Sequence, residues 1–169
     1  LGTINAALKP HGLKFAPDPA WADKSAIGGA IGNNSTGSHS LVYEKTDAYI
    51  ESCEVVLSDG TVHEFGKVSI EDLENAEEGK GILQDVYSKV YKILEEKEEI
   101  KNRYPDLNRN VSGYNLKRIC EESLEGEINM SHLICGSEGT LAIVTEVKLS
   151  LVEIPKRKEV ILFAYENLK

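Results

Sequence analysis

The chain has 169 residues, of which 41% are hydrophobic and 28% charged, a composition typical of one globular domain. Its formal net charge of −9 at pH 7 excludes a protein that binds nucleic acid through the phosphates, because it offers no basic footprint. No apolar run approaches the roughly 20 residues needed to cross a bilayer, and no secretory signal opens the chain.

The cysteine and histidine patterns argue against a metal site. Cys53, Cys120 and Cys135 are odd in number and lack CxxC spacing, which is typical of reduced, mostly buried thiols in a cytoplasmic protein. The four histidines never pair at ligand spacing. We therefore expect no metal ion within this chain.

The N-terminal part predicts short helices. Residues 1–12 carry apolar side chains at helical spacing, and Gly12 ends the pattern. Residues 15–19 are expected to be extended, because a proline disfavours helical backbone in the residue before it. A further helical turn is predicted near Ile27, with Ser25 as its N-cap.

A β-hairpin is the clearest local prediction. Residues 50–57 and 62–65 have the composition of two strands, and Asp59-Gly60 between them is typical of a type I′ turn. A polar, acidic excursion over residues 67–81 follows the hairpin.

An amphipathic helix is predicted over residues 81–103, where apolar side chains recur every three or four residues. Its tail, residues 95–99, is interpreted as a solvated charged face, with a partner-binding surface as the alternative. Residues 116–122 predict another short helix, and residues 132–135 a short buried segment.

The C-terminal part predicts strands over residues 142–152 and 160–165. Alternation in the first places one set of side chains on a common face: Ile143, Thr145, Val147, Leu149 and Leu151. We predict an α+β fold, in which a mainly antiparallel sheet made of the hairpin and these strands is flanked by helices.

A glycine-rich turn, Cys135-Gly136-Ser137-Glu138-Gly139-Thr140, leads into the strand at residue 142. Gly136 and Gly139 permit positive φ and place no Cβ in the way of a ligand. We expect the bend to leave the N–H groups of Ser137, Gly139 and Thr140 free for an anion or the edge of a heterocycle. An ordinary turn before an ordinary strand is the alternative.

A second glycine-rich stretch, residues 27–37, does not fit the common nucleotide motifs. Gly28-Gly29-x-x-Gly32 lacks the first glycine of a dinucleotide fingerprint, and no strand precedes it. Gly32 and Gly37 have P-loop spacing, but Ser38-His39 follow where Lys-Ser/Thr is needed. These NAD and ATP sites are excluded, and the remaining loop of backbone donors and small amides suits a flavin.

Several motifs in the same order resemble the FAD-linked oxidases of the vanillyl-alcohol oxidase type, whose FAD-binding domain is of the PCMH type. They are Pro17-Asp18-Pro19, Ile27-Gly28-Gly29, Asn34-x-x-Gly37 and Gly136-Ser137-Glu138-Gly139-Thr140-Leu141. Gly32-Asn33-Asn34-Ser35-Thr36-Gly37 and Asn110-Val111-Ser112-Gly113-Tyr114-Asn115-Leu116 are most similar to large D-lactate or D-2-hydroxyglutarate dehydrogenases with a fused iron–sulfur region.

The resemblance covers about residues 2–155 and is loose over residues 67–105. It implies that residues 1–155 are the second lobe of the FAD-binding domain, with residues 67–105 as a helical insertion, and that residues 156–169 begin a substrate or cap domain. Because the chain begins with Leu1 and stops inside a predicted strand, we expect a segment of a larger flavoprotein. Any iron–sulfur cluster would lie outside this segment.

The resemblance implies FAD as the cofactor, with other catalytic residues expected outside the segment. His39 directly follows the loop over residues 33–37, so it is a candidate on the flavin or substrate side. The chain departs from its relatives at Ala142, where they often have Gly, and at Ser35-Thr36-Gly37, where they have Ala-Gly-Gly. The residues implied to bind FAD are Pro17, Asp18, Pro19, Ala26, Gly28, Gly29, Asn33, Asn34, Ser35, Thr36, Gly37, Gly136, Glu138, Gly139, Thr140, Leu141, Ile143 and Val144.

The implied activity is oxidation of a D-2-hydroxy acid, with hydride transfer to FAD and onward transfer of electrons to an unidentified acceptor. Another flavin oxidase or reductase of the same fold and a non-catalytic binding or assembly module are the alternatives. The expected partner is a small 2-hydroxy acid, and neither nucleic acid nor a transmembrane segment is expected. The expected location is the cytoplasm, and peripheral membrane association of the parent protein stays open.

Overall fold

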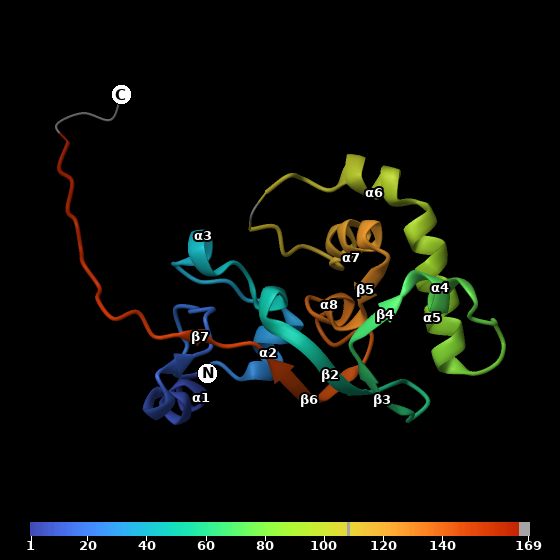
Figure 1. Cartoon of the computed structure of the whole chain (residues 1–169), viewed down its shortest axis with the longest axis horizontal. Coiled ribbons are helices and arrows are strands. Elements are labelled where there is room, and N and C mark those ends of the chain that lie inside the picture. The colour runs from blue at the N-terminus through green and yellow to red at the C-terminus, as the bar shows by residue number, and fades with distance from the viewer. Residues whose placement is uncertain (108, 166–169) are drawn as a thin grey trace.

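The structure, a computed structural model, describes residues 1–107 and 109–165 and has an α+β fold (Figure 1). Its central sheet has three antiparallel strands in the order β3 (Val62–Phe65), β2 (Ile50–Val56) and β6 (Ile143–Leu149). Two smaller antiparallel pairs join β1 (Leu13–Lys14) to β7 (Val152–Glu153) and β4 (Lys67–Ser69) to β5 (Glu127–Asn129). The predicted fold class is confirmed.

The helices gather in two groups on either side of β2 (Figure 1). The first group contains α1 (Gly2–Leu8), η1 (Lys9–His11), α2 (Ile27–Gly32), α3 (Ser40–Tyr43) and η2 (Thr46–Tyr49). The second contains α4 (Ile70–Glu74), α5 (Ile82–Glu95), α6 (Lys97–Arg103), α7 (Leu116–Glu122), η3 (Ser123–Glu125) and α8 (Met130–Ile134). None of these helices has both the length and the apolar character needed to cross a lipid bilayer.

The main core lies between the central sheet and the second group of helices. Its fully buried side chains include Val55, Phe65, Leu73, Ile119 and Ile128. A smaller cluster of Ile31, Ile50 and Cys135 joins α2 to β2 and to the turn after α8. This second cluster fixes the two glycine-rich stretches against the same strand.

The N-terminal helix and the helix at residue 27 are both present, but the predicted cap is wrong. The hydroxyl of Ser25 donates to the carbonyl of Trp21 (2.9 Å), and Ala26 occupies the N-cap position of α2. Alanine has no side-chain acceptor, so the first N–H groups of α2 receive no capping bond.

The hairpin is confirmed, whereas its turn type is wrong. Gly60 has φ 87°, but Asp59 does not share the positive φ that a type I′ turn requires. The Asp59 carboxylate accepts the N–H of Thr61 (2.8 Å), and the N–H of Gly60 donates to the carbonyl of Leu57 (3.0 Å). These bonds match the longer hairpin loop in which a turn is followed by a glycine bulge.

The helix predicted over residues 81–103 is divided at Glu96 into α5 and α6. In one continuous helix the positions that follow Leu94 on the core side would be the charged Lys97 and Glu98. The break turns Ile100 into the core instead, where it is 9% exposed. Residues 95–99 are exposed, as a solvated face requires.

Residues 67–81 contain more structure than their polarity indicates. They form β4 and α4, and the Ser69 hydroxyl caps α4 by accepting the N–H of Asp72 (3.0 Å). The short helix over residues 116–122 is confirmed as α7, and the buried segment over residues 132–135 belongs largely to α8.

The strand predicted over residues 160–165 is wrong. These residues form no sheet pairing with the rest of the described chain, and they extend away from its body (Figure 1). Val160 and Leu162 are 96% and 91% exposed. An apolar pattern makes a strand only where a neighbouring strand accepts its hydrogen bonds. Residues 166–169 of the predicted following domain lie outside the described residues.

The strand predicted over residues 142–152 is divided into β6 and β7, and its alternation is interrupted by a bulge. Val147 pairs with Cys53, but Val144 pairs with Val55, so the register shifts around Thr145. As a result Val144 and Val147 both pack on the core, while Ile143 is 69% exposed. The predicted common face of Ile143 and Val147 is therefore wrong.

Glu44 is held in a conformation that suits glycine, with φ 52° and ψ −139°. Such backbone strain amounts to about 1–3 kcal/mol in a residue with a Cβ. We expect Glu44→Gly to raise the free energy of unfolding by about 1 kcal/mol, as measured by urea denaturation. Glu44→Ala removes the same carboxylate but keeps the Cβ, so a similar gain in that control would contradict the strain argument.

Candidate functional site

Two glycine-rich segments far apart in the sequence form one surface. The N–H of Gly136 donates to the carbonyl of Ile31, and the N–H of Glu138 donates to the carbonyl of Gly32, both at 2.8 Å. These bonds join the end of α2 to the turn before β6. The pairing of the two stretches that the sequence analysis singled out is thus a direct backbone contact.

A hollow of about 230 Å³ lies between α2, this turn and the start of β6. A Cβ atom added at Gly28, Gly29 or Gly139 would meet no other atom within 4 Å, so the glycines leave open space. The hollow is lined by Gly28, Ile31, Gly32, Ile134, Ser137, Gly139, Ala142, Ile143 and Val144. A shallow, glycine-walled and largely apolar space of this kind fits part of a flat heterocycle.

The donors beside the hollow differ from those predicted. Ser137 and Thr140 use their N–H groups within the turn, on the carbonyls of Ile134 (3.1 Å) and Ser137 (3.0 Å), so two of the three predicted free donors are wrong. Gly139 retains an N–H without an acceptor in the described chain. Gly28 and Gly29 add two more, because the first bond of α2 runs from Ala30 to Ala26.

The loop over residues 33–37 presents one asparagine and buries the other. Asn33 is exposed, and its Oδ1 accepts the hydroxyl of Ser35 at 2.6 Å. Asn34 is only 2% exposed, has φ 48°, and its Oδ1 accepts the N–H of Asp47 at 3.0 Å. The loop therefore offers the Asn33 amide to a ligand, while the Asn34 oxygen is used inside the protein.

Asp18 ties the Pro17-Asp18-Pro19 segment to the loop over residues 33–37. Its carboxylate contacts His39 Nδ1 and accepts the N–H of His39 at 3.3 Å. A Cβ at Gly37 would lie 2.3 Å from the Asp18 carbonyl oxygen, so only glycine fits there. The contact orients the exposed His39 ring and leaves Nε2 as its free nitrogen.

Several other residues predicted to bind FAD lie on the same two glycine-rich segments. Thr36 donates its hydroxyl to the carbonyl of Glu44 (3.2 Å), and Thr140 donates its own to the carbonyl of Ser137 (2.6 Å). Thr140 also meets the hydroxyl of Tyr114 at 3.0 Å. Leu141 and Ile143 are exposed beside Gly139.

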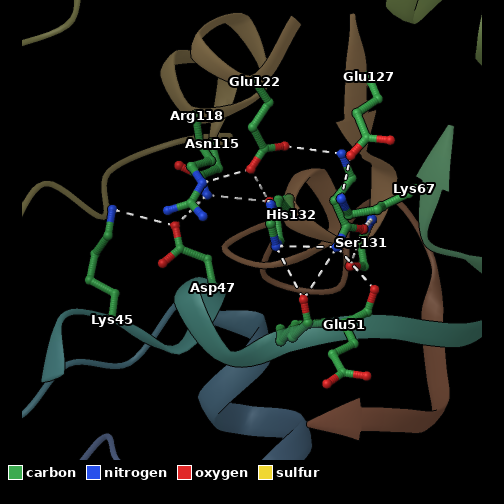
Figure 2. Close-up of polar contacts among 12 residues, drawn as sticks. Lys45, Asp47, Glu51, Lys67, Asn115, Arg118, Glu122, Glu127, Ser131 and His132 are labelled. Carbon is green, nitrogen blue, oxygen red and sulfur yellow. Dashed lines mark hydrogen bonds and ion pairs between the residues drawn. The ribbon is translucent and has the colours of Figure 1, made fainter. Parts of the chain in front are cut away.

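A buried polar network runs from Asp47 to Glu122 and His132 (Figure 2), and Asp47 connects it to the loop through Asn34. Its pairings were not foreseen from the sequence. Asp47 is 1% exposed, and its Oδ2 accepts the side-chain amide of Asn115 (2.7 Å) and lies 3.6 Å from Lys45 Nζ. Its Oδ1 is buried and has no hydrogen-bond partner in the part of the chain that the structure describes. Asp47 thus links the 3₁₀ turn before β2 to the segment before α7.

The network continues through α7 to α8. Glu122 Oε1 accepts Arg118 Nε (2.7 Å) and contacts His132 Nδ1 (2.6 Å), and its Oε2 accepts the N–H of Asn129 (3.0 Å). Burial alone would raise the pKa of Glu122, but the bonds from His132, Arg118 and Asn129 lower it to about 2. Glu122 is therefore an ionised anchor at neutral pH.

Only part of this network had a sequence signal. Arg118 and Glu122 stand four residues apart on a predicted helix, which is the spacing of a helical ion pair. Nothing local relates Asp47 to Asn115, because the two lie 68 residues apart and meet only through the fold.

The three cysteines are buried free thiols. Burial raises the pKa of Cys53 to about 12 and also raises the pKa of Cys135, so both stay protonated. The predicted buried, reduced thiols are confirmed as a structural feature, and neither of these two groups is a nucleophile.

Comparison with known proteins agrees with this geometry. Residues 1–66 match the protein family described as FAD binding domain. That region contains α2, the loop over residues 33–37 and the β2–β3 hairpin. The turn before β6 lies beyond it and joins the hollow through the backbone bonds described above.

Longer similarities extend over most of the chain. It is 38% identical to a D-2-hydroxyglutarate dehydrogenase of Pseudomonas putida over 90% of its own length and 15% of the relative. It is 32% identical to glycolate oxidase subunit GlcD of Bacillus subtilis, over 96% of the chain and 23% of the relative. It is 28% identical to a D-lactate dehydrogenase of Archaeoglobus fulgidus, over 89% of the chain and 22% of the relative.

The chain is homologous to D-2-hydroxyglutarate dehydrogenases and to FAD-linked oxidases of the GlcD type, so the resemblance noted in the sequence is confirmed. It spans 15% to 16% of the length of the D-2-hydroxyglutarate dehydrogenases that it matches in Pseudomonas putida and Escherichia coli.

Glu122 should contribute to stability in a pH-dependent way. Because its folded-state pKa is about 2 and its ordinary value is 4.5, its contribution is fully present above pH 4.5 and is lost as pH falls toward 2. We expect Glu122→Gln to lower the free energy of unfolding by about 2 kcal/mol at neutral pH, with the difference shrinking toward pH 2.

Urea denaturation at several pH values measures this difference. Glu99→Gln is the matched control, because Glu99 forms the same i,i+4 pair with Arg103 on an exposed helix face. The quantity compared is the loss of unfolding free energy caused by each substitution. If the loss for Glu122→Gln is the same at every pH, or equals the loss for Glu99→Gln, then Glu122 does not stabilise the fold as an ionised group.

Proposed function

We propose that this chain is one lobe of the FAD-binding domain in a flavin-dependent dehydrogenase of D-2-hydroxy acids. The observation that carries the proposal is the open glycine-walled hollow. It forms where α2, which lies within the region matched by the FAD-binding family, meets the turn before β6. The names of the relatives support the substrate class, since they describe enzymes of D-2-hydroxyglutarate, D-lactate and glycolate.

In this proposal residues 1–155 form the second lobe, residues 67–105 are a helical insertion, and residues 156–169 begin a following substrate or cap domain. The exposed apolar side chains of residues 160–165 support the last part, because such a segment is normally covered by further structure.

The chain's residues would hold FAD from two sides. Gly28 and Gly29 offer free N–H groups and open faces, and Gly139 offers the same across the hollow. Asn33 would add a side-chain amide at the exposed end of the loop. When bound, FAD supplies the acceptor for the hydride of the substrate.

His39 is the residue that we place on the substrate side. Its Nδ1 is held by Asp18, so Nε2 is directed outward and can accept a proton from a substrate hydroxyl. In such a pair the carboxylate holds the ring in one orientation. In this proposal the remaining catalytic groups lie outside these residues, and the electrons pass to an external acceptor or to an iron–sulfur relay.

We also place the protein in the cytoplasm. Three buried free thiols support a reducing compartment, since cysteines of secreted proteins usually form disulfides.

The hollow can be tested without disturbing the fold. Gly28 lies in a helix with open space around its Cα, so Gly28→Leu should maintain or slightly raise thermal stability. The leucine side chain would project into the space assigned to FAD, and we expect FAD affinity to fall by roughly tenfold or more. Fluorescence titration of the flavin-free protein with FAD measures this change.

Gly28→Ala, which adds a single methyl group, is the graded control and should have a smaller effect. Unchanged FAD affinity in a stable Gly28→Leu protein would rule out the hollow as the flavin site.

The substrate class is tested by anaerobic reduction of the flavin in the full-length protein. We expect D-2-hydroxyglutarate or D-lactate to bleach the visible flavin absorbance, and the L enantiomers to leave it unchanged. If dithionite bleaches the flavin and no 2-hydroxy acid does, the protein is a different flavin enzyme. A protein that binds no flavin at all would instead be a non-catalytic module.

A further inference from the structure

The segment over residues 109–115 contacts both glycine-rich segments of the candidate site. Near its start, Arg109 donates to the carbonyl of Gly37 at 3.2 Å. Near its end, the hydroxyl of Tyr114 lies 3.0 Å from the hydroxyl oxygen of Thr140, which belongs to the turn before β6. The segment can therefore act on the site, although the hollow itself is lined by other residues.

The bond between the two hydroxyls has a definite direction. Thr140 Oγ1 lies 2.6 Å from the carbonyl oxygen of Ser137, and a carbonyl oxygen only accepts. A threonine hydroxyl has a single proton, so Thr140 gives it to Ser137 and has only lone pairs left for Tyr114. Tyr114 is therefore the donor and Thr140 the acceptor.

From Ser137 the hydrogen bonds continue into the other glycine-rich segment. The Ser137 carbonyl shares a peptide group with the N–H of Glu138, which donates to the carbonyl of Gly32 at 2.8 Å. That carbonyl shares a peptide group with the N–H of Asn33, which donates to the carbonyl of Gly29 at 3.2 Å. Successive bonds in such a chain polarise one another. The chain that begins at the phenol thus extends through both segments that border the hollow.

The turn before β6 has a conformation that needs support. The N–H of Thr140 donates to the carbonyl of Ser137 at 3.0 Å, which closes a four-residue turn. Its two central residues, Glu138 and Gly139, have φ 56° and 73°, the pattern of a type I′ turn. Left-handed backbone is unfavourable for a residue with a Cβ, such as Glu138. The bonds of the Thr140 side chain therefore oppose relaxation of the turn.

Tyr114 is separated from the hollow by this turn. Its side chain is 41% exposed and lines a neighbouring cavity of about 210 Å³, which Gly136 also lines. Ser137 and Gly139 line the hollow, so the turn borders both spaces. An effect of the phenol on a ligand in the hollow would thus pass through the backbone of the turn.

We propose that Tyr114 is a positioning residue of the flavin site. Its hydroxyl holds Thr140, and through Thr140 it holds the turn in the conformation that offers the N–H of Gly139 to FAD. The inference rests on the proposed function, since it takes the hollow as the place of FAD.

The structural step can be tested without flavin, by amide hydrogen exchange in the flavin-free, full-length protein. Tyr114→Phe removes only the hydroxyl, and we expect exchange in peptides that cover residues 136–140 to become roughly threefold faster or more. Tyr87→Phe is the matched control. It removes a hydroxyl that lies 3.2 Å from His63 Nε2, outside both glycine-rich segments, and should leave exchange in the turn unchanged.

The effect on the cofactor is measured by fluorescence titration with FAD and by the visible spectrum of the bound flavin. Tyr114→Phe should bind FAD roughly threefold to tenfold less tightly. It should also shift the flavin absorbance and reduction potential, because a displaced N–H changes the polarity at the edge of the ring. A purely structural role would lower thermal stability and leave the spectrum and the potential of the bound flavin unchanged.

A second substitution tests whether Tyr114 acts through Thr140. Thr140→Val removes the hydroxyl and should weaken FAD binding at least as much as Tyr114→Phe does. In the Thr140→Val background, Tyr114→Phe should have no further effect, because the bond is already lost. Thr140→Ser keeps a hydroxyl and should lose less affinity than Thr140→Val. Circular dichroism and thermal denaturation establish that each variant is folded.

Unchanged amide exchange in Tyr114→Phe would overturn the inference, and so would additive effects of Tyr114→Phe and Thr140→Val on FAD affinity. If the wild type binds FAD and Tyr114→Phe binds it equally well with the same spectrum, this inference is wrong and the proposed function stands. A wild type that binds no FAD contradicts the proposed function, and the positioning role fails with it.

Discussion

The buried carboxylate of Asp47 is the interaction on which the arrangement of the candidate site depends. Its backbone N–H holds Asn34, and its Oδ2 holds Asn115, so one residue joins the loop after α2 to the segment before α7. A charge removed from water is tolerated only when nearby groups balance it, and Lys45 and Arg118 do so here. Because hydrogen bonds are directional, this support restricts the conformation of the loop over residues 33–37 more than apolar contacts would.

Local elements were predictable where their signal is local. The hairpin strands and α7 follow from patterns shorter than ten residues, and both are present. The predictions that were wrong depend on contacts that a short stretch of sequence does not contain. The turn at Asp59 depends on a bond that its side chain makes, the break at Glu96 depends on where the core lies, and the bulge at Thr145 depends on the register with β2.

The candidate site was predictable in outline but not in detail. Two glycine-rich stretches and their order were enough to relate the chain to FAD-linked oxidases, and the fold brings these stretches together. The sequence does not distinguish Asn33 from Asn34, although one is exposed and the other turns inward. Nor does it distinguish the donors of the turn before β6, because their use depends on the path of the backbone.

The central position of β2 has a consequence for the order of folding. Its neighbour β3 follows within a few residues, but β6 is synthesised only after the whole helical segment between them. Until then one edge of the β2–β3 hairpin is unpaired, and an open strand edge favours incorrect pairing with other chains. Such long-range pairing is also slow. Since the turn over residues 136–140 immediately precedes β6, the glycine-walled hollow is completed together with the sheet, and nascent chains that lack this strand do not yet contain the proposed cofactor site.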